Sequence, residues 1–155
     1  MQTIQWQCCN FSELTSQQLY AILQARSAVF VVEQNCPYLD MDNVDQSCLH
    51  LIAWTENQEV AAYLRIVPPG IKFTEASLGR VITTQIGRGA GLGRQLLKQG
   101  IAACQDAYPS TGIRIAAQQY LEKFYQSFGF ITVSDIYLED DIPHIDMLLN
   151  ITPSN

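Results

Sequence analysis

The stretch RVITTQIGRGAGLGRQLLK, residues 80–98, decides the fold class of this chain. It begins as a β-rich run, passes through a polar connector with glycines at alternate positions, and continues as an amphipathic helix. Gly89, Gly91 and Gly93 leave backbone N–H groups uncovered at the helix start, where the helix dipole favours an anion. Three basic residues lie in its last eleven positions: Arg88, Arg94 and Lys98. The pattern predicts an α/β element that binds phosphate, and its alternative is a solvated glycine-rich turn.

Two common phosphate-binding motifs do not fit this stretch. A Walker A loop ends in Gly-Lys-Ser/Thr, whereas Gly93 is followed by Arg94 and Gln95. A dinucleotide-binding fingerprint would place glycine or alanine at position 94 and would normally follow the first strand of the fold. The sequence therefore disfavours nucleotide enzymes of these two classes.

Hydrophobic spacing on both sides of the stretch predicts one domain over residues 1–155. Thr15 and Gln18 form a capping-box pattern for a helix that continues to about Phe30. The expected order is strand 3–9, helix 15–30, loop 33–47, hairpin 48–67, strand 76–83, helix 91–108, strand 112–117, helix 120–128 and strands 130–137 and 144–150. This order predicts an α/β (α+β) fold in which helices cover both faces of a mixed sheet.

The spacing Arg88-x-x-Gly91-x-Gly93 resembles the Q/R-x-x-G-x-G/A loop of the GNAT superfamily of N-acetyltransferases, which binds the pyrophosphate of acetyl-CoA. The segment FYQSFGF, residues 124–130, is similar to the aromatic-Tyr-x-x-x-Gly-Phe segment of the same superfamily. RSAVFVVEQNCPY (26–38) and DIPHIDM (141–147) resemble the ElaA-type family of bacterial acetyltransferases. The resemblance implies a GNAT fold, in which the sheet is splayed open between strands 76–83 and 112–117.

The resemblance also implies an acetyl-CoA-dependent N-acetyltransferase that acts on a primary amine of a small molecule or peptide by direct attack. In that reading the strand backbone at Val81, Ile82 and Thr83 pairs with pantetheine, and an N–H near Ile82 polarises the thioester carbonyl. The pyrophosphate would be held by Arg88, Gly89, Ala90, Gly91, Leu92, Gly93 and Arg94. Gln118 would orient a substrate or line the pantetheine channel. Two alternatives stay open, a non-catalytic acyl-CoA sensor and a transferase for another acyl chain or an oxygen acceptor.

Tyr125 is the expected general acid, because a phenol with a pKa of about 10 stays protonated at neutral pH and can donate to the departing thiolate. Its alternative role is that of a core aromatic. His144 and Glu33 are the candidate bases, the first for its near-neutral pKa and the second for its place after an apolar helix. His50 lies in an apolar strand and is interpreted as a core histidine.

Fifteen acidic and nine basic residues give a net charge of -6, which disfavours nucleic acid and anionic membrane as partners. Five cysteines without paired spacing, and no secretory signal, predict reduced thiols in the cytoplasm. No metal-ligand spacing appears, so no metal is expected. Two acidic groups, Glu33, Asp40, Asp42 and Asp45 and then Glu139, Asp140, Asp141 and Asp146, either attract a cationic amine or are solvated loop charge. Residues 144–150 could pair as an exposed edge in a homodimer.

Overall fold

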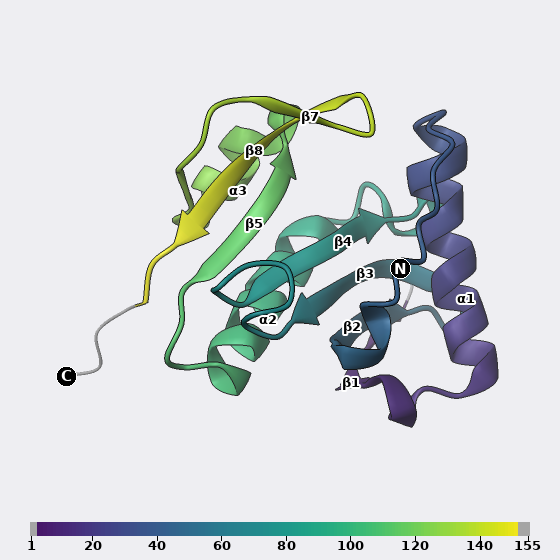
Figure 1. The fold of residues 1–155 in the computed structure, drawn as a ribbon. Helices are drawn as coiled ribbons and strands as arrows, with labels where there is room; N and C mark the ends of the chain where they lie inside the picture. The colour runs from purple at the N-terminus through teal and green to yellow at the C-terminus, as the bar shows by residue number, and fades with distance from the viewer. Residues whose placement is uncertain (1–2, 152–155) are drawn as a thin grey trace.

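Two antiparallel sheets form the framework of the computed structural model, which describes residues 3–151 (Figure 1). The first sheet has the order β1-β2-β3-β4, and the second has the order β5-β8-β6 with β7 also paired to β8. The strands are β1 Gln5–Asn10, β2 Leu49–Trp54, β3 Val60–Val67, β4 Ser77–Thr83, β5 Ile113–Gln118, β6 Ile131–Thr132, β7 Tyr137–Glu139 and β8 Ile142–Leu149. The helices are α1 Ser16–Arg26, α2 Leu92–Ala107 and α3 Glu122–Gln126.

The two sheets meet at a single parallel bridge between Ala76 and Ile113. The N–H of Arg114 donates to the carbonyl of Ala76 at 2.9 Å, directly after that bridge. From this joint β4 and β5 diverge toward their carboxyl ends, and β4 ends the first sheet without a further ladder partner among the described residues (Figure 1). The predicted splayed sheet is therefore confirmed.

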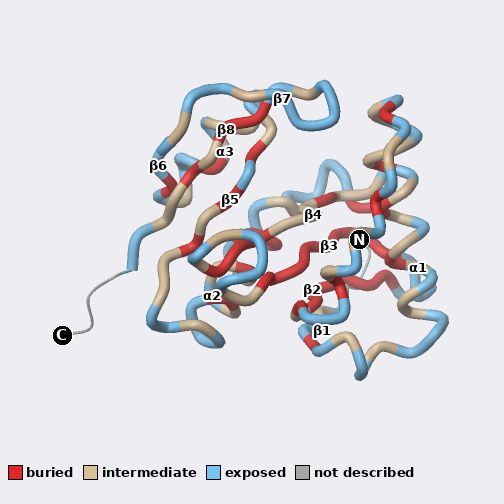
Figure 2. The backbone as a smooth tube through the Cα atoms, viewed as in Figure 1, coloured by how far each residue is buried: buried red, intermediate tan, exposed pale blue. Residues whose placement is uncertain are grey.

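Helices cover both faces of the first sheet, as predicted. One buried cluster lies between the sheet and α2 and includes Leu64, Leu96 and Leu97, while a second lies beneath α1 and includes Ile22 and Tyr63. Every position of β3 is buried, and Figure 2 shows buried positions running along β2 and β3. Within residues 3–151, no helix has both the length and the apolar character needed to cross a bilayer.

The first helix is longer than its sequence pattern indicates. The capping box is present, because the Gln18 N–H donates to Thr15 Oγ1 and the Thr15 N–H donates to Gln18 Oε1. After Arg26 the chain continues in wider π-helical turns over Ser27–Glu33, whereas the hydrophobic spacing ends at about Phe30. The extra turns carry Glu33 to the level of the loop after β4.

The expected strand 130–137 is split into β6 and β7. Between them the side chain of Ser134 replaces a backbone partner, since its Oγ accepts the N–H of Asp146 in β8 at 2.8 Å. β8 lies inside its sheet, with β5 on one side and β6 and β7 on the other. The expectation of a free dimer edge at 144–150 is therefore wrong, because both edges of this strand are occupied.

Candidate functional site

A cavity of about 480 Å³ opens where β4 and β5 diverge. Residues 77–81 of β4 form one wall and residues 115–118 of β5 form the other. Tyr125 of α3 lines it as well, and the turn between β7 and β8 borders it with Glu139 and Asp140. Two contacts cross the cavity: Gln118 Nε2 donates to Gln34 Oε1 at 3.3 Å, and Cys36 Sγ donates to the Asp140 carbonyl at 3.4 Å. The space lies between the two halves of the fold and has the size of a small-molecule site.

Tyr125 belongs to the core and to this cavity at the same time. Its ring makes edge-on contacts with Phe124 and Phe130, with centroids 5.4 and 5.9 Å apart, and the residue is 5% exposed. Burial, with a smaller effect of the Tyr120 phenol, raises the pKa of Tyr125 above its ordinary value. The phenol is therefore neutral at pH 7 and can act as a hydrogen-bond donor.

His144 lines the same cavity from β8. Its Nδ1 lies 2.7 Å from the carbonyl oxygen of Ile142, and a carbonyl can only accept. Nδ1 therefore carries the hydrogen in the neutral ring, which leaves the lone pair on Nε2. Nε2 lies 3.4 Å from Glu139 Oε2, a contact that is an ion pair only when the ring is protonated. The geometry suits a group that takes up a proton at Nε2.

The glycine-rich turn follows β4 after one 3₁₀ turn, Gln85–Gly87, and is open to solvent. Gly89 and Gly91 have φ values of 87° and 71°, in the left-handed region that favours glycine, and a Cβ at either position would meet no atom within 4 Å. The first helical bond of α2 runs from the Gln95 N–H to the Gly91 carbonyl, so the N–H groups of Leu92, Gly93 and Arg94 precede it. The exposed Ala90 sits at the tip of this turn, and the buried Leu92 side chain anchors it. This arrangement leaves backbone N–H groups and the positive end of the helix dipole open to an anion.

Arg88, the first arginine of this turn, makes an ion pair and a hydrogen bond within the protein. Arg88 pairs through Nη2 with Glu33 Oε1 at 2.7 Å, and its Nε donates to the Thr83 carbonyl at 3.2 Å. Glu33 is not among the residues that line the cavity. The structure thus brings Glu33 to the glycine-rich turn, away from Tyr125 and His144.

Arg94 links the same turn to the helix that carries Tyr125. Its guanidinium lies 4.8 Å from the centroid of the Phe128 ring, and its Nη1 donates to Ser127 Oγ at 3.3 Å. The cation–π contact and the hydrogen bond hold the start of α2 against α3.

At the free edge of β4, every second residue directs its backbone N–H and carbonyl away from β3. The Thr84 N–H donates to the Ala61 carbonyl of β3, so by strand alternation Ile82 also directs its N–H toward β3. Val81 and Thr83 then face the open edge, and Val81 lines the cavity. The expected N–H donor near Ile82 is better matched by Val81, because the Ile82 N–H is directed toward β3 and the Val81 N–H is not. The positive φ of Arg80, 51°, marks the bulge that sets this alternation.

Sequence reasoning missed a buried ionic network behind the β4 wall. Asp40, Asp42 and Asp45 were expected to be solvated or to attract an amine, but each is paired. The pairs are Arg26 with Asp40 and Asp45, Arg65 with Asp42 and Asp45, Arg80 with Asp40 and Asp42, and Lys72 with Asp42. The sequence signal was an arginine inside an apolar run, as in AAYLRIV, because such a cation needs a buried partner.

The network also fixes the charge state of its members. Burial alone would raise the pKa of Asp42, but the hydrogen bonds and charge of Arg65, together with Arg80, lower it well below its usual range. His50 is a buried core histidine, as predicted: its ring nitrogens lie 2.7 Å from the Tyr63 hydroxyl and 2.9 Å from the Asp45 carbonyl. Burial lowers the pKa of His50, so this ring is neutral at pH 7.

Comparisons with known proteins agree with this architecture. Residues 12–151 match the family described as the Acetyltransferase (GNAT) domain. Protein ElaA of Escherichia coli strain K12 is 45% identical over 146 residues, which cover 93% of this chain and 95% of that protein. The crystal structure of Escherichia coli ElaA is similar with a TM-score of 0.87 at 44% identity, over 94% of this chain and 99% of that one. An acyl-CoA N-acyltransferase from Pseudomonas aeruginosa gives a TM-score of 0.89 at 40% identity, with the same two coverages.

Proposed function

This chain belongs to the GNAT acetyltransferase family, and on that premise we propose that it transfers the acetyl group of acetyl-CoA to a primary amine of a small molecule or peptide. Acyl transfer is the general chemistry of the family. The choice of an acetyl donor, of a primary amine and of direct attack is our proposal.

One observation carries the proposal. A neutral phenol and an imidazole whose lone pair lies on Nε2 line one cavity, and that cavity borders the strand that leads to the glycine-rich turn. Tyr125 and His144 could therefore act on opposite ends of one reaction while the phosphates of the donor are held outside the cavity. A purely structural cavity would not need this pairing of a donor and an acceptor of protons.

The residues that would hold acetyl-CoA are the edge of β4 and the turn after it. The free backbone of Val81 and Thr83 would pair with pantetheine, and Arg88 to Arg94 would bind the diphosphate through N–H groups and charge. Glu33 would orient Arg88 through their 2.7 Å ion pair, which replaces its expected role as a base. Gln118 lines the channel between the two walls.

Bound acetyl-CoA supplies an activated thioester, whose C–S bond breaks as the amine nitrogen bonds to the carbonyl carbon. His144 Nε2 takes the proton that the amine loses, and Glu139 stabilises the resulting imidazolium. Tyr125 donates its hydroxyl hydrogen to the departing sulfur, as a hydrogen bond or a full proton. The Val81 N–H polarises the thioester carbonyl from the free edge of β4.

Acetyl-CoA binding and thiol release test the proposal together. At one hundred times its Kd, acetyl-CoA should stabilise the fold by about 2.7 kcal/mol, which raises Tm by about 5–10 °C. Tyr125→Phe should lower kcat by about 100-fold with the Kd for acetyl-CoA nearly unchanged, since the ring is kept and only the donor is lost. Tyr120→Phe is the matched control, because that phenol also lines the cavity but is 76% exposed.

Two results would contradict this function. An unmoved melting curve at millimolar acetyl-CoA would remove the donor site from consideration. Binding of acetyl-CoA without thiol release from any amine of a broad panel would favour the alternative of a non-catalytic acyl-CoA sensor. Equal activity of Tyr125→Phe and wild type would remove Tyr125 from the chemistry while leaving acyl transfer in place.

A further inference from the structure

We infer that the acceptor is an amino acid, a molecule with a carboxylate next to the amine that is acetylated. The inference rests on the proposed function and names the substrate class of the same cavity. It is argued from the charges on the two sides of the cavity, neither of which enters the acetyl-CoA site.

The side of the cavity next to β3 and β4 carries excess positive charge. Four cations of the ionic network, Arg26, Arg65, Lys72 and Arg80, share three carboxylates, Asp40, Asp42 and Asp45. One positive charge is therefore left without a counter-ion within the network. Three of the four cations, Arg65, Lys72 and Arg80, line the cavity.

The uncompensated donors lie at the cavity itself. Arg80 Nε lies 2.8 Å from Asp40 Oδ1 as an ion pair but makes no hydrogen bond, and its Nη2 donates to the Asp40 carbonyl and to Asp42 Oδ2. Its Nη1 makes no ion pair or hydrogen bond with residues 3–151. Lys72 is 45% exposed and makes one contact, 3.4 Å from Asp42. Arg65, which is 2% exposed, has an Nε without a hydrogen-bond partner in the described part of the chain. A carboxylate placed here would pair with Lys72 Nζ and Arg80 Nη1, while the enclosed Arg65 Nε adds positive charge behind them.

Gly79 keeps this side of the cavity open. It pairs with Arg65 across β3 and β4, and a Cβ on it would lie 3.6 Å from Arg65 Nε. With glycine at this position, nothing from residue 79 covers the guanidinium on the cavity side. Arg65 and Gly79 therefore both line the cavity, with the Arg65 Nε enclosed just behind its wall.

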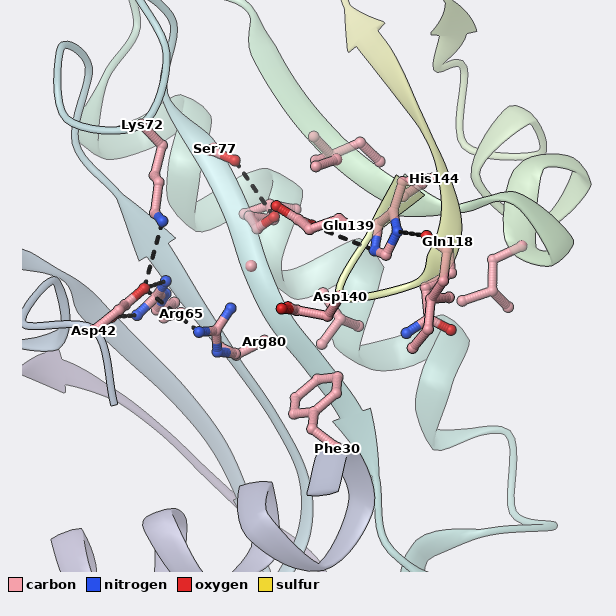
Figure 3. Close-up of a pocket in the computed structure, with 18 of the residues that line it drawn as sticks. Phe30, Asp42, Arg65, Lys72, Ser77, Arg80, Gln118, Glu139, Asp140 and His144 are labelled. Carbon is pink, nitrogen blue, oxygen red and sulfur yellow. Dashed lines mark hydrogen bonds and ion pairs between the residues drawn. The ribbon is translucent and has the colours of Figure 1, made fainter. Parts of the chain in front are cut away.

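The opposite side carries negative charge and the proton acceptor. Glu139 and Asp140 border the cavity from the β7–β8 turn, beside His144. Figure 3 shows Lys72, Asp42 and Arg65 on one side of the view and His144 and Gln118 on the other, with Arg80, Glu139 and Asp140 between them. An ammonium group would be attracted to the acidic side, where His144 can deprotonate it, while its carboxylate would face Arg80 and Lys72.

This charge pattern discriminates between classes of amine. A polyamine would bring a second cation against Arg80 and Lys72, where like charges repel. An amine without any anion would leave the open donors unsatisfied. An amino acid satisfies both sides and fits a cavity of about 480 Å³.

The test measures thiol release from acetyl-CoA with a panel of L-amino acids, the matching L-amino acid amides and linear polyamines. For at least one side chain, kcat/KM for the acid should exceed that for its amide by about tenfold or more. Lys72→Met should remove most of that preference through a higher KM for the acid. Lys123→Met, an exposed lysine outside the cavity, is the control and should leave the preference intact.

Calorimetry separates this inference from the proposed function. Wild-type protein saturated with CoA should bind the preferred amino acid more tightly than its amide, by a similar factor, even without turnover. Such binding without thiol release would support the amino-acid site and overturn the transferase. Thiol release that is equal or faster with amides or polyamines would overturn the amino-acid acceptor and leave the transferase standing.

Discussion

Replacing Asp45 by asparagine removes the carboxylate that two buried arginines share. Arg26 Nη1 and Arg65 Nη1 both donate to Asp45 Oδ1, at 2.8 and 2.9 Å. The side chain of Arg26 is 1% exposed, that of Arg65 2% and that of Asp45 8%, so water can replace little of the lost interaction. Asparagine keeps the shape and one acceptor but loses the charge between the two guanidiniums.

The expected loss of stability follows from the partners that remain. Removing one member of a buried ion pair costs about 3–5 kcal/mol. Arg26 keeps Asp40 and Arg65 keeps Asp42, so Asp45→Asn should lie at the lower end, at about 3 kcal/mol. For a chain of this size that is a fall in Tm of about 6–12 °C.

The same substitution should show a defined pH dependence. Burial by itself raises the pKa of Asp45, but the hydrogen bonds and charges of Arg26 and Arg65 outweigh it and hold the pKa below its ordinary value of 3.8. A carboxyl whose pKa is depressed on folding contributes its full stabilisation above the unfolded pKa and loses it as the pH falls toward the folded pKa. The difference in free energy of unfolding between wild type and Asp45→Asn should therefore become smaller below about pH 3.8.

Urea unfolding followed by far-UV circular dichroism measures both effects, at about pH 7 and at about pH 3. Asp141→Asn is the control, because Asp141 is exposed in the β7–β8 turn and has no ion-pair partner in the described ranges. Equal free energies of unfolding for wild type and Asp45→Asn at pH 7 would refute the shared-carboxylate argument. A difference that stays constant on acidification would refute the assigned direction of the pKa shift.

Two further predictions concern the turn after β4. A Cβ at Gly87 would lie 2.1 Å from the Ala61 carbonyl oxygen, so Gly87→Ala should destabilise by about 3 kcal/mol or more. In Gly89→Ala the new Cβ meets no atom, so the variant should lose only about 1–2 kcal/mol of stability, from the strain of a left-handed backbone. Thermal unfolding compares the two variants, and equal losses of stability would contradict the contact assigned at Gly87. Arg88→Gln should raise the Kd for acetyl-CoA about tenfold by calorimetry, whereas Glu33→Gln should leave kcat nearly unchanged. A large loss of kcat in Glu33→Gln would restore Glu33 as the base.

Local features of the site were predictable from the sequence. The glycine-rich turn follows from residue spacing, because positive φ values and an open helix start depend on a few consecutive residues. The capping box at Thr15 is local in the same way and was confirmed. The split of the strand at 130–137 was not predictable, because Ser134 replaces a backbone acceptor only when β8 lies beside it.

The roles of the charged residues depended on partners far away in the chain. Arg88 and Glu33 are separated by 55 positions, and Arg65 and Asp42 by 23. An ion pair requires its atoms to lie within a few ångströms, and residue spacing does not contain that distance. The sequence therefore did not show that Asp40, Asp42 and Asp45 are paired, because only the fold brings Arg26, Arg65 and Arg80 close to them.

By itself, the sequence determined the order of helices and strands up to residue 129, the open turn at residues 88–93 and the family to which the chain belongs. Each of these depends on neighbours along the chain, through backbone conformation and hydrophobic periodicity. The tertiary structure alone decided which side chains share the cavity, that Val81 faces the free edge, and which acids are neutralised. Those outcomes depend on distances between strands and loops remote in sequence, which only the packed sheets define.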